Sequence, residues 1–452
     1  MKEMGVIGRW ALILLLLGNV YGGFAQDANT ARAQHIYELF VAGQGDSIHA
    51  ALNRELQEKL APALFNDSFR QAEKMFGKSI SKGEWKTDSA QGITIYYSDV
   101  EFERYNLRFL VAFDADGALN TIRLVPAPAV STAQPVAYDE TKMDERDITL
   151  GADGYKLPGT LTLPKRAVGP DACRVPCVIL VHGSGPHDRD ETIGPNKPFR
   201  DLAWGLAERG IAVVRYEKRT KAYGAACVPA GRELDYDTEA VDDAVAIVEQ
   251  VRALPELAPD SVYVLGHSLG GTLAPRIAGR SKGLAGIIIL AGLARPLEDA
   301  LEEQFYYTSS LTDSSVNVKA QLDELKQQLA NVKKLGTEEF DETISLPLGQ
   351  PRSYWLFANA YKPVEVAAKL KLPIFVLQGE RDYQVTMEDF GLWRSGLLRC
   401  KNAYFKSYPK LNHLLQEGSG KATPFEYSHA SPVPAYVMDD IASFVRGKQN
   451  TL

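Results

Sequence analysis

Short apolar runs alternate with helix-like stretches along the C-terminal part of this chain, and this pattern limits the possible folds more than any other feature. The runs are rich in Val, Ile and Leu, and they lie at residues 178–181, 211–216, 262–265, 287–290 and 374–377. Strands of a parallel sheet read as continuous apolar runs because helices cover both of their faces. Residues 146–452 are therefore predicted to form an α/β domain, with a mostly parallel sheet between layers of helices.

Residues 26–128 follow a different pattern. Apolar residues at three- and four-residue steps predict helices from Asn29 to about Phe76. Strand-like segments, alternating or rich in β-branched and aromatic residues, follow at 93–97, 107–113 and 119–124. We expect a small α+β domain of unknown role here, joined to the α/β domain by a linker at 129–145.

One interval breaks the alternation, because about 80 residues separate the fourth and fifth apolar runs. A helical cap insertion is predicted there, at about 293–365. An amphipathic helix that packs down as part of the cap is expected, with a coiled-coil dimer helix as the alternative. Its apolar stripe consists of Val318, Leu322, Leu325, Leu329 and Val332.

The first 25 residues have the pattern of a targeting segment. Lys2 and Arg9 precede an apolar run at 10–17, and small residues follow up to Ala25. This predicts a signal peptide cleaved after Ala25 and a secreted or periplasmic protein, with an uncleaved anchor as the alternative. No later stretch approaches the ~20 apolar residues that a spanning helix needs, so stable membrane insertion is not expected.

Charge and cysteine content exclude some partners. A net charge of -7 gives no basic field for nucleic acid. The four cysteines are too sparse for a disulfide framework, and no second Cys or His pair matches a zinc site, so buried thiols or one or two disulfides are expected. They are Cys173, Cys177, Cys227 and Cys400. The oligomeric state is not constrained by the sequence.

Residues 266–271 (GHSLGG) follow the run at 262–265 and precede a helix-forming stretch that begins at Thr272. The G-x-S-x-G pattern at a strand-to-helix junction is typical of a nucleophile on a sharp turn, and its glycines are needed because a Cβ there would collide with backbone. Ser268 is therefore predicted to be the nucleophile. The N-terminus of the next helix favours negative charge on the substrate oxygen.

A second glycine-rich turn, residues 182–186 (HGSGP), follows the run at 178–181. Open parallel sheets bind ligands at this edge, beyond the carboxyl ends of the strands. The predicted oxyanion hole combines the backbone amides of Ser184 and Leu269, with Gly185 as the alternative to Ser184.

A serine nucleophile needs a histidine to accept its proton and an acid to orient that histidine. In folds that place the nucleophile on such a turn, the acid and then the histidine follow the serine along the chain. Only His413 and His429 follow Ser268 in the sequence. His413 comes in a loop after the strand-like segment 403–408 and is the predicted base, with His429 as the alternative.

The acid is expected just beyond the run at 374–377. Asp382 is the predicted acid, and Glu380 is its rival.

The order and spacing of these motifs resemble the α/β-hydrolase superfamily over about residues 147–446. Residues 183–197 (GSGPHDRDETIGPNK) are similar to bacterial esterases that carry a small α+β domain ahead of the hydrolase. Within this superfamily, the similarity favours the dienelactone-hydrolase and serine-aminopeptidase branches. The former use a cysteine nucleophile, whereas residue 268 is serine.

The resemblance implies a serine carboxylesterase that cleaves a small-molecule ester through an acyl-enzyme. No metal or cofactor is needed for such a triad. A serine exopeptidase or amidase with the same triad is the first alternative, for which the substrate's amine would need carboxylates such as Glu302, Glu303, Asp341 and Glu342. A binding or cell-surface protein with an incidental hydrolase domain is the second.

Three further features have an ordinary structural interpretation. The cluster of His187, Asp188, Asp190 and Glu191 is expected to shape the loop over the oxyanion hole rather than bind a metal. His267 is expected to pack beneath the nucleophile. An aromatic group in the insertion would line an acyl pocket or form the core of the cap; it comprises Trp355, Phe357 and Tyr361.

Overall fold

The computed structural model describes residues 24–90, 93–103, 106–127, 138–152, 154–167, 173–311 and 316–447. The predicted signal peptide, apart from its last two residues, and the predicted linker up to residue 137 lie outside these ranges. The chain forms two compact units, one of residues 1–129 and 308–319 and the other of residues 130–307 and 320–452. None of the helices within the described ranges combines the length and the apolar character needed to cross a membrane.

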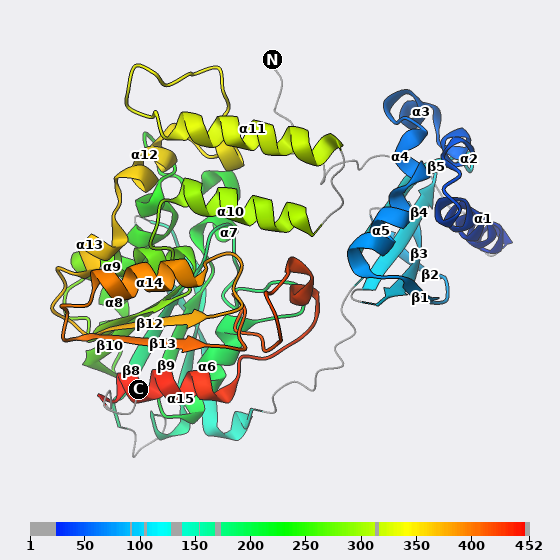
Figure 1. The fold of residues 1–452 in the computed structure, drawn as a ribbon. Helices are drawn as coiled ribbons and strands as arrows, with labels where there is room; N and C mark the ends of the chain where they lie inside the picture. The colour runs from blue at the N-terminus through cyan, green and yellow to red at the C-terminus, as the bar shows by residue number, and fades with distance from the viewer. Residues whose placement is uncertain are drawn as a thin grey trace. The chain divides into compact units, whose positions relative to one another are not determined.

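The N-terminal unit packs helices against one face of an antiparallel sheet (Figure 1). The helices are α1 (Phe24–Val41), α2 (Gly45–Ala51), α3 (Arg54–Lys59), α4 (Ala63–Asn66) and α5 (Ser68–Phe76). The strands are β1 (Ser79–Lys82), β2 (Lys86–Ala90), β3 (Ile93–Phe102), β4 (Asn106–Phe113) and β5 (Leu119–Pro126), in the order β1-β3-β4-β5, with β2 also paired to β3. Aromatic rings fill its core, where Tyr37 and Phe40 of α1 contact Phe69 and Phe109.

The larger unit contains an eight-stranded sheet with the order β13-β12-β11-β10-β8-β9-β7-β6. Its strands are β6 (Met143–Leu150), β7 (Leu157–Pro164), β8 (Val175–Val181), β9 (Ala212–Tyr216), β10 (Leu257–His267), β11 (Gly286–Leu290), β12 (Ile374–Gly379) and β13 (Ala403–Tyr408). The strands from β13 to β9 run parallel, and β7 and β6 continue the sheet antiparallel. Each predicted apolar run lies in one of the parallel strands.

The first strand of the larger unit, β6, begins earlier in the chain than the sequence indicated. Met143 pairs with Pro164, so β6 starts within the segment predicted as linker. The alternation of polar and apolar residues in this edge strand is weak, because most of its outward side chains are charged and only its two end residues are buried.

Helices cover both faces of the sheet, as the apolar runs required (Figure 1). On one face α6 (Pro198–Glu208) and α15 (Ala435–Val445) bury apolar side chains against the strands. On the other face α8 (Asp242–Arg252), α9 (Leu269–Arg280) and α14 (Met387–Gly396) do the same. The fold is that of an α/β-hydrolase.

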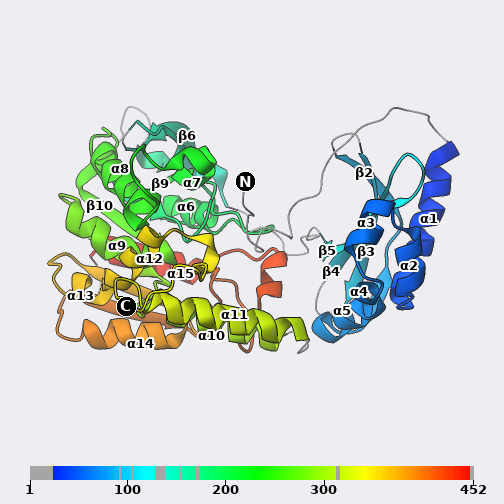
Figure 2. The ribbon, with the colours of Figure 1, turned by 90° about the horizontal axis from the view of Figure 1, so that it is seen from above.

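The insertion between β11 and β12 supplies α10 (Leu297–Ser310), α11 (Val316–Val332), α12 (Arg352–Ala360) and α13 (Pro363–Ala367). Helices α10 and α11 run side by side (Figure 1 and Figure 2), joined by a 2.7 Å ion pair between Asp299 and Lys333. On the predicted stripe of α11, Leu329 and Val332 are buried. The side chain of Val318 lies outside the described part.

Candidate active site

The predicted nucleophile stands on a strained turn. Ser268 follows the end of β10 with φ 53° and ψ −117°, and α9 starts at the next residue. A Cβ at Gly266 would lie 2.0 Å from the carbonyl oxygen of Gly270, and a Cβ at Gly270 would lie 2.2 Å from that of Val181. Both flanking positions therefore accept only glycine without movement of the backbone.

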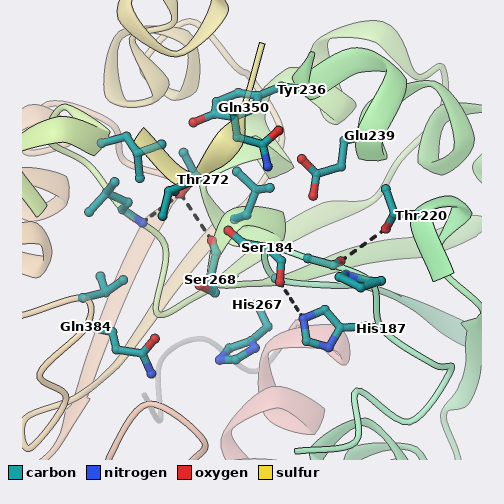
Figure 3. Close-up of a pocket in the computed structure, with 18 of the residues that line it drawn as sticks. Ser184, His187, Thr220, Tyr236, Glu239, His267, Ser268, Thr272, Gln350 and Gln384 are labelled. Carbon is teal, nitrogen blue, oxygen red and sulfur yellow. Dashed lines mark hydrogen bonds between the residues drawn. The ribbon is translucent and has the colours of Figure 1, made fainter. Parts of the chain in front are cut away.

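Ser268 opens into a cavity of about 410 Å³ at the carboxyl edge of the sheet (Figure 3). The cavity is lined by residues from the oxyanion loop (residues 182–192), the first turn of α9, the cap and the loops after β12 and β13. Both Ser184 and Leu269 are among the lining residues, and so is His413. The structure thus gathers four of the five predicted site residues around one cavity.

The fifth, Asp382, lies directly behind His413. His413 Nδ1 and Asp382 Oδ2 are 2.6 Å apart, and both side chains are buried. The other carboxylate oxygen, Oδ1, accepts hydrogen bonds from the backbone amides of Gln384 (2.7 Å) and Val385 (3.1 Å). Because both oxygens are held, the carboxylate fixes the orientation of the imidazole and leaves Nε2 for the nucleophile.

Within the described chain, no hydrogen bond joins Ser268 Oγ to His413. Hydrogen bonds of this kind are often long in a site without substrate and tighten when substrate binds. Both residues line the same cavity.

The alternative acid, Glu380, and the alternative base, His429, lie away from the cavity around Ser268. Glu380 accepts a 2.8 Å hydrogen bond from Ser407 Oγ in a solvent-exposed position. His429 is exposed and lies in a separate surface hollow that includes Arg381 and Gln416. Neither side chain lines the cavity around Ser268.

The oxyanion loop faces the N-terminus of α9. The Ser184 carbonyl accepts a 2.7 Å hydrogen bond from His187 Nε2, and the Gly185 carbonyl accepts one from Thr220 Oγ1 at 3.3 Å (Figure 3). Because a carbonyl shares its peptide plane with the N–H of the next residue, the bond to the Ser184 carbonyl fixes the direction of the Gly185 amide. The Ser184 amide is fixed in the same way, because the Gly183 carbonyl accepts a 2.7 Å hydrogen bond from Lys218 Nζ. The amide of Leu269 belongs to the first turn of a helix, where no intrahelical acceptor exists.

A buried ion pair connects this loop to the loop of the predicted base. Glu191 Oε1 accepts a 2.7 Å hydrogen bond from the Gly183 amide, and Glu191 Oε2 lies 2.8 Å from His267 Nδ1. His267 Nε2 then donates to the carbonyl oxygen of His413 at 2.9 Å. We call this chain of contacts, from Gly183 through Glu191 and His267 to His413, the strut.

The strut carries a full charge pair. A carbonyl oxygen only accepts, so His267 Nε2 holds a proton, and the facing carboxylate favours a second proton on Nδ1. Burial opposes ionisation of Glu191, but the charge and hydrogen bond of His267 outweigh it and lower the pKa of Glu191 to about 2. Burial also works against the charged form of His267, yet Glu191 raises the pKa of His267 above its usual value.

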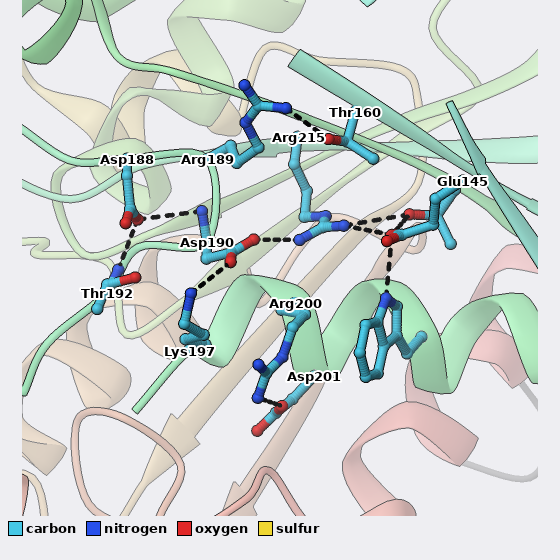
Figure 4. A network of polar contacts seen from close by, with 12 residues as sticks. Glu145, Thr160, Asp188, Arg189, Asp190, Thr192, Lys197, Arg200, Asp201 and Arg215 are labelled. Atoms are coloured by element: carbon cyan, nitrogen blue, oxygen red, sulfur yellow. Dashed lines mark hydrogen bonds and ion pairs between the residues drawn. The ribbon is translucent and has the colours of Figure 1, made fainter. Parts of the chain in front are cut away.

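The acidic cluster shapes the loop, as the sequence indicated. Asp188 Oδ1 accepts hydrogen bonds from the amides of Asp190 and Thr192, while Asp190 pairs with Lys197 at 2.9 Å and with the buried Arg215 (Figure 4). In the described ranges, no three His, Cys, Asp or Glu side chains are grouped so that they could hold a metal ion. The ion pair of Glu191 with His267 was not anticipated, since 76 residues separate the two in sequence.

Several cavity residues were missed by the sequence reasoning. Glu239 lines it from the π-helical turn η5 (Asp237–Val241), and Tyr236 lines it from the position before that turn. Gln350 lines it after the short turn η6 (Pro347–Gly349). By contrast, the carboxylates suggested for amine recognition are not among the lining residues, and Glu303 pairs with Arg295 instead. No motif marks the missed positions, because η5 and the cap have no recurring sequence pattern.

The aromatic group of the insertion does not line the cavity around Ser268 but packs into the core that the cap shares with the strands and α9. Trp355 is fully buried and donates a hydrogen bond to the Pro347 carbonyl oxygen at 3.3 Å. The Tyr361 hydroxyl donates to the Thr272 carbonyl oxygen in α9 at 3.0 Å. All four cysteines are free thiols, of which Cys177 is buried in β8 and Cys173 is exposed.

Two protein families match separate parts of this chain. Residues 175–417 match the family described as serine aminopeptidase, S33, and residues 33–121 match one described as protein of unknown function (DUF3887). The chain is 37% identical over 351 residues to esterase EstD of Thermotoga maritima, covering 78% of this chain and 79% of EstD. It is also similar to the solved structure of Est1E from Butyrivibrio proteoclasticus, with a TM-score of 0.44, 17% identity and coverage of 68% of this chain and 99% of that one.

Proposed function

We propose that this chain, which belongs to the serine aminopeptidase S33 family of α/β-hydrolases, cleaves carboxylic esters. The reaction proceeds through an acyl-enzyme on Ser268. The chain is a carboxylic ester hydrolase, as its sequence relationship to esterase EstD over most of both chains supports. The observation that carries the mechanism is the 2.6 Å contact between Asp382 and His413 at the cavity into which the strained Ser268 projects.

In the proposed mechanism His413 Nε2 removes the proton of Ser268, whose Oγ attacks the ester carbonyl. The carbonyl oxygen becomes an oxyanion, which the amides of Ser184 and Leu269 stabilise. His413 then protonates the leaving alcohol. Water, activated by the same imidazole, releases the acid and restores Ser268. Asp382 keeps the proton of His413 on Nδ1 throughout.

The peptidase alternative has less support. An exopeptidase would need an unpaired carboxylate at the cavity for the substrate's amine, and Glu302, Glu303, Asp341 and Glu342 do not line it. Glu239 lines the cavity but already forms an ion pair with Lys218. A purely binding role has no specific observation in its favour.

The substitution Ser268→Ala tests the proposal. It should lower kcat for p-nitrophenyl acetate by about 10⁶-fold while the melting temperature changes little, because only the nucleophile is lost. Ser184→Ala is the matched control within the same cavity, since Ser184 acts through its backbone amide, and it should keep most of the activity. Retention of most of the esterase rate by Ser268→Ala would show that another residue is the nucleophile.

A further inference from the structure

Three polar side chains on one side of Ser268 have no part in the proposed catalytic steps. Tyr236, Glu239 and Gln350 lie together above Ser268 in Figure 3, whereas Gln384 lies on the opposite side. We call these three residues the polar wall. Leucines supply much of the remaining lining, including Leu293, Leu297 and Leu301. The cavity therefore offers a substrate both apolar surface and a concentrated polar surface.

Two members of the polar wall lack protein partners. Tyr236 is 4% exposed, and its ring packs edge-on against Tyr354 with centroids 4.8 Å apart. Within the described chain, neither the Tyr236 hydroxyl nor the side-chain amide of Gln350 takes part in a hydrogen bond. The Tyr236 side chain is almost fully buried and Gln350 is half-buried, and both residues line the cavity. Polar groups that face a cavity without a protein partner are available to hydrogen-bond a ligand, which is the basis of the inference.

Glu239 is also buried, at 4% exposure, and its charge is already balanced. Its Oε1 accepts a hydrogen bond from Lys218 Nζ, which also donates to the Gly183 carbonyl oxygen at 2.7 Å. The Tyr354 hydroxyl also hydrogen-bonds Glu239. A carboxylate has about four acceptor sites, so Glu239 keeps acceptor capacity for a ligand in the cavity that it lines. Because Lys218 neutralises it, the pair has no net charge with which to attract a cation.

The local backbone explains how Tyr236 and Glu239 reach the same cavity. Tyr236 immediately precedes the π-helical turn η5, which contains Glu239. Both side chains line the cavity, and π-helical turns occur frequently at functional sites. Gln350 approaches from the cap, just after Leu348, which has the unusual φ of 59°.

The combined chemistry is that of a neutral, hydroxyl-rich ligand. The wall presents a hydroxyl and an amide, which donate and accept, and a carboxylate, which accepts. An apolar group placed there would leave these groups without partners. We propose that the polar wall binds a polyhydroxylated ring, such as a sugar or cyclic polyol, on one side of the scissile ester. This inference rests on the proposed esterase function and names its substrate class.

Matched pairs of esters test the inference on the full chain. In the first pair the ring is the alcohol, and methyl 6-O-acetylglucoside is compared with cyclohexylmethyl acetate. In the second pair the ring is the acid, and methyl quinate is compared with methyl cyclohexanecarboxylate. At least one hydroxylated ester should show a kcat/KM about tenfold or more above its partner, and the responding pair shows which side of the ester carries the ring.

Two substitutions assign the preference to the wall. Tyr236→Phe keeps the ring and removes the hydroxyl, and Gln350→Leu removes the amide. Each should lower kcat/KM for the preferred hydroxylated ester by about threefold to tenfold, mainly through KM, and change the deoxygenated partner less than twofold. Tyr306→Phe is the control, because Tyr306 is exposed on α10 outside the cavity and should leave both esters unchanged.

The possible failures are distinguishable. If p-nitrophenyl acetate is cleaved but no hydroxylated ester exceeds its partner, the inference is wrong and the esterase function stands. A preference for 2-aminoethyl acetate over every neutral ester would likewise overturn it, because the wall would then select a cation. If no ester is cleaved and a fluorophosphonate does not label Ser268, the proposed function itself fails, and the inference fails with it.

Discussion

The nucleophile turn and the oxyanion loop enclose the same reacting centre, but different forces hold them. The turn, residues 266–271, is fixed by backbone contacts so close that a Cβ at Gly266 or Gly270 would lie about 2 Å from a carbonyl oxygen. The oxyanion loop, residues 182–192, is fixed by buried charges, above all Glu191 with His267. One side of the site depends on shape and the other on ionisation.

Both segments contain a strained residue, which makes the contrast sharper. Ser268 and Glu191 have nearly the same positive φ, 53° and 51°. Strain of this kind persists only where the surroundings impose it. At Ser268 the surroundings are the ends of β10 and α9. At Glu191 they are its own hydrogen bond to Gly183 and its ion pair, so a change of charge should release one segment and not the other.

The largest effect on stability is expected from Glu191→Gln, which keeps the shape of the side chain and removes its charge. Breaking a buried ion pair by neutralising one partner costs about 3–5 kcal/mol of unfolding free energy. The turnover number should also fall, by up to about hundredfold, because the strut sets the position of the oxyanion loop relative to His413. Urea unfolding and p-nitrophenyl acetate kinetics measure the two effects.

An exposed ion pair of the same loop is the control. Arg189 contacts Asp147 at 3.0 Å, but the Asp147 side chain is 92% exposed. Asp147→Asn should therefore cost less than about 1 kcal/mol and leave turnover unchanged. Equal losses in the two variants would mean that the strut is no more important than an ordinary surface contact.

A smaller effect is expected when the nucleophile turn is perturbed by shape alone. In Gly270→Ala the new Cβ would meet the Val181 carbonyl oxygen at 2.2 Å, so backbone must shift, at a cost of about 1–3 kcal/mol. Gly279 in the same helix faces open space, and a Cβ added there would have no neighbouring atom within 4 Å. Gly279→Ala should therefore be neutral or stabilise by up to about 1 kcal/mol, and a similar loss at both positions would show that contact at the turn is not the cause.

The same contrast explains how far the sequence could be interpreted. The turn was predictable because steric limits leave a fixed pattern, glycines around Ser268 after an apolar run, and the chain order of the fold then led to Asp382 and His413. The parallel strands were predictable because burial on both faces produces continuous apolar runs. Steric requirements act on neighbouring residues, and neighbours are what a sequence displays.

The ion pair of Glu191 with His267 and the polar wall could not be predicted, because each brings together residues that are distant from one another in the sequence. Glu191 and His267 meet only after β8 and β10 become adjacent in the sheet. Tyr236 and Gln350 line one cavity although one precedes α8 and the other lies in the cap. The start of β6 was misplaced because a charged edge strand has neither a continuous apolar run nor a clear alternation. Interactions between distant segments depend on tertiary structure that local pattern does not contain.

The smallest predicted effect is a pH dependence of the unfolding free energy. It distinguishes the oxyanion loop, which is held by charge, from the nucleophile turn, which is held by shape. The lowered pKa of Glu191 gives stability that is present above its ordinary value of 4.5 and is lost as pH falls toward about 2. The raised pKa of His267 gives stability that is complete below its ordinary value of 6.5 and is lost as pH rises through the raised value. The difference in unfolding free energy between wild type and Glu191→Gln should therefore be largest between about pH 5 and 6.

At pH 4 that difference should already be smaller by about 1 kcal/mol, because Glu191 is largely protonated in the unfolded chain but not in the folded one. It should shrink again above neutral pH as His267 loses its proton. The difference between wild type and Gly270→Ala should stay constant over the same range, since no ionisable group contributes to that contact. Urea titrations of the three proteins at pH 4, 5.5, 7 and 9 measure both differences. A flat profile for Glu191→Gln would mean that Glu191 and His267 are not a charged pair, and the oxyanion loop would then be held by shape like the turn it faces.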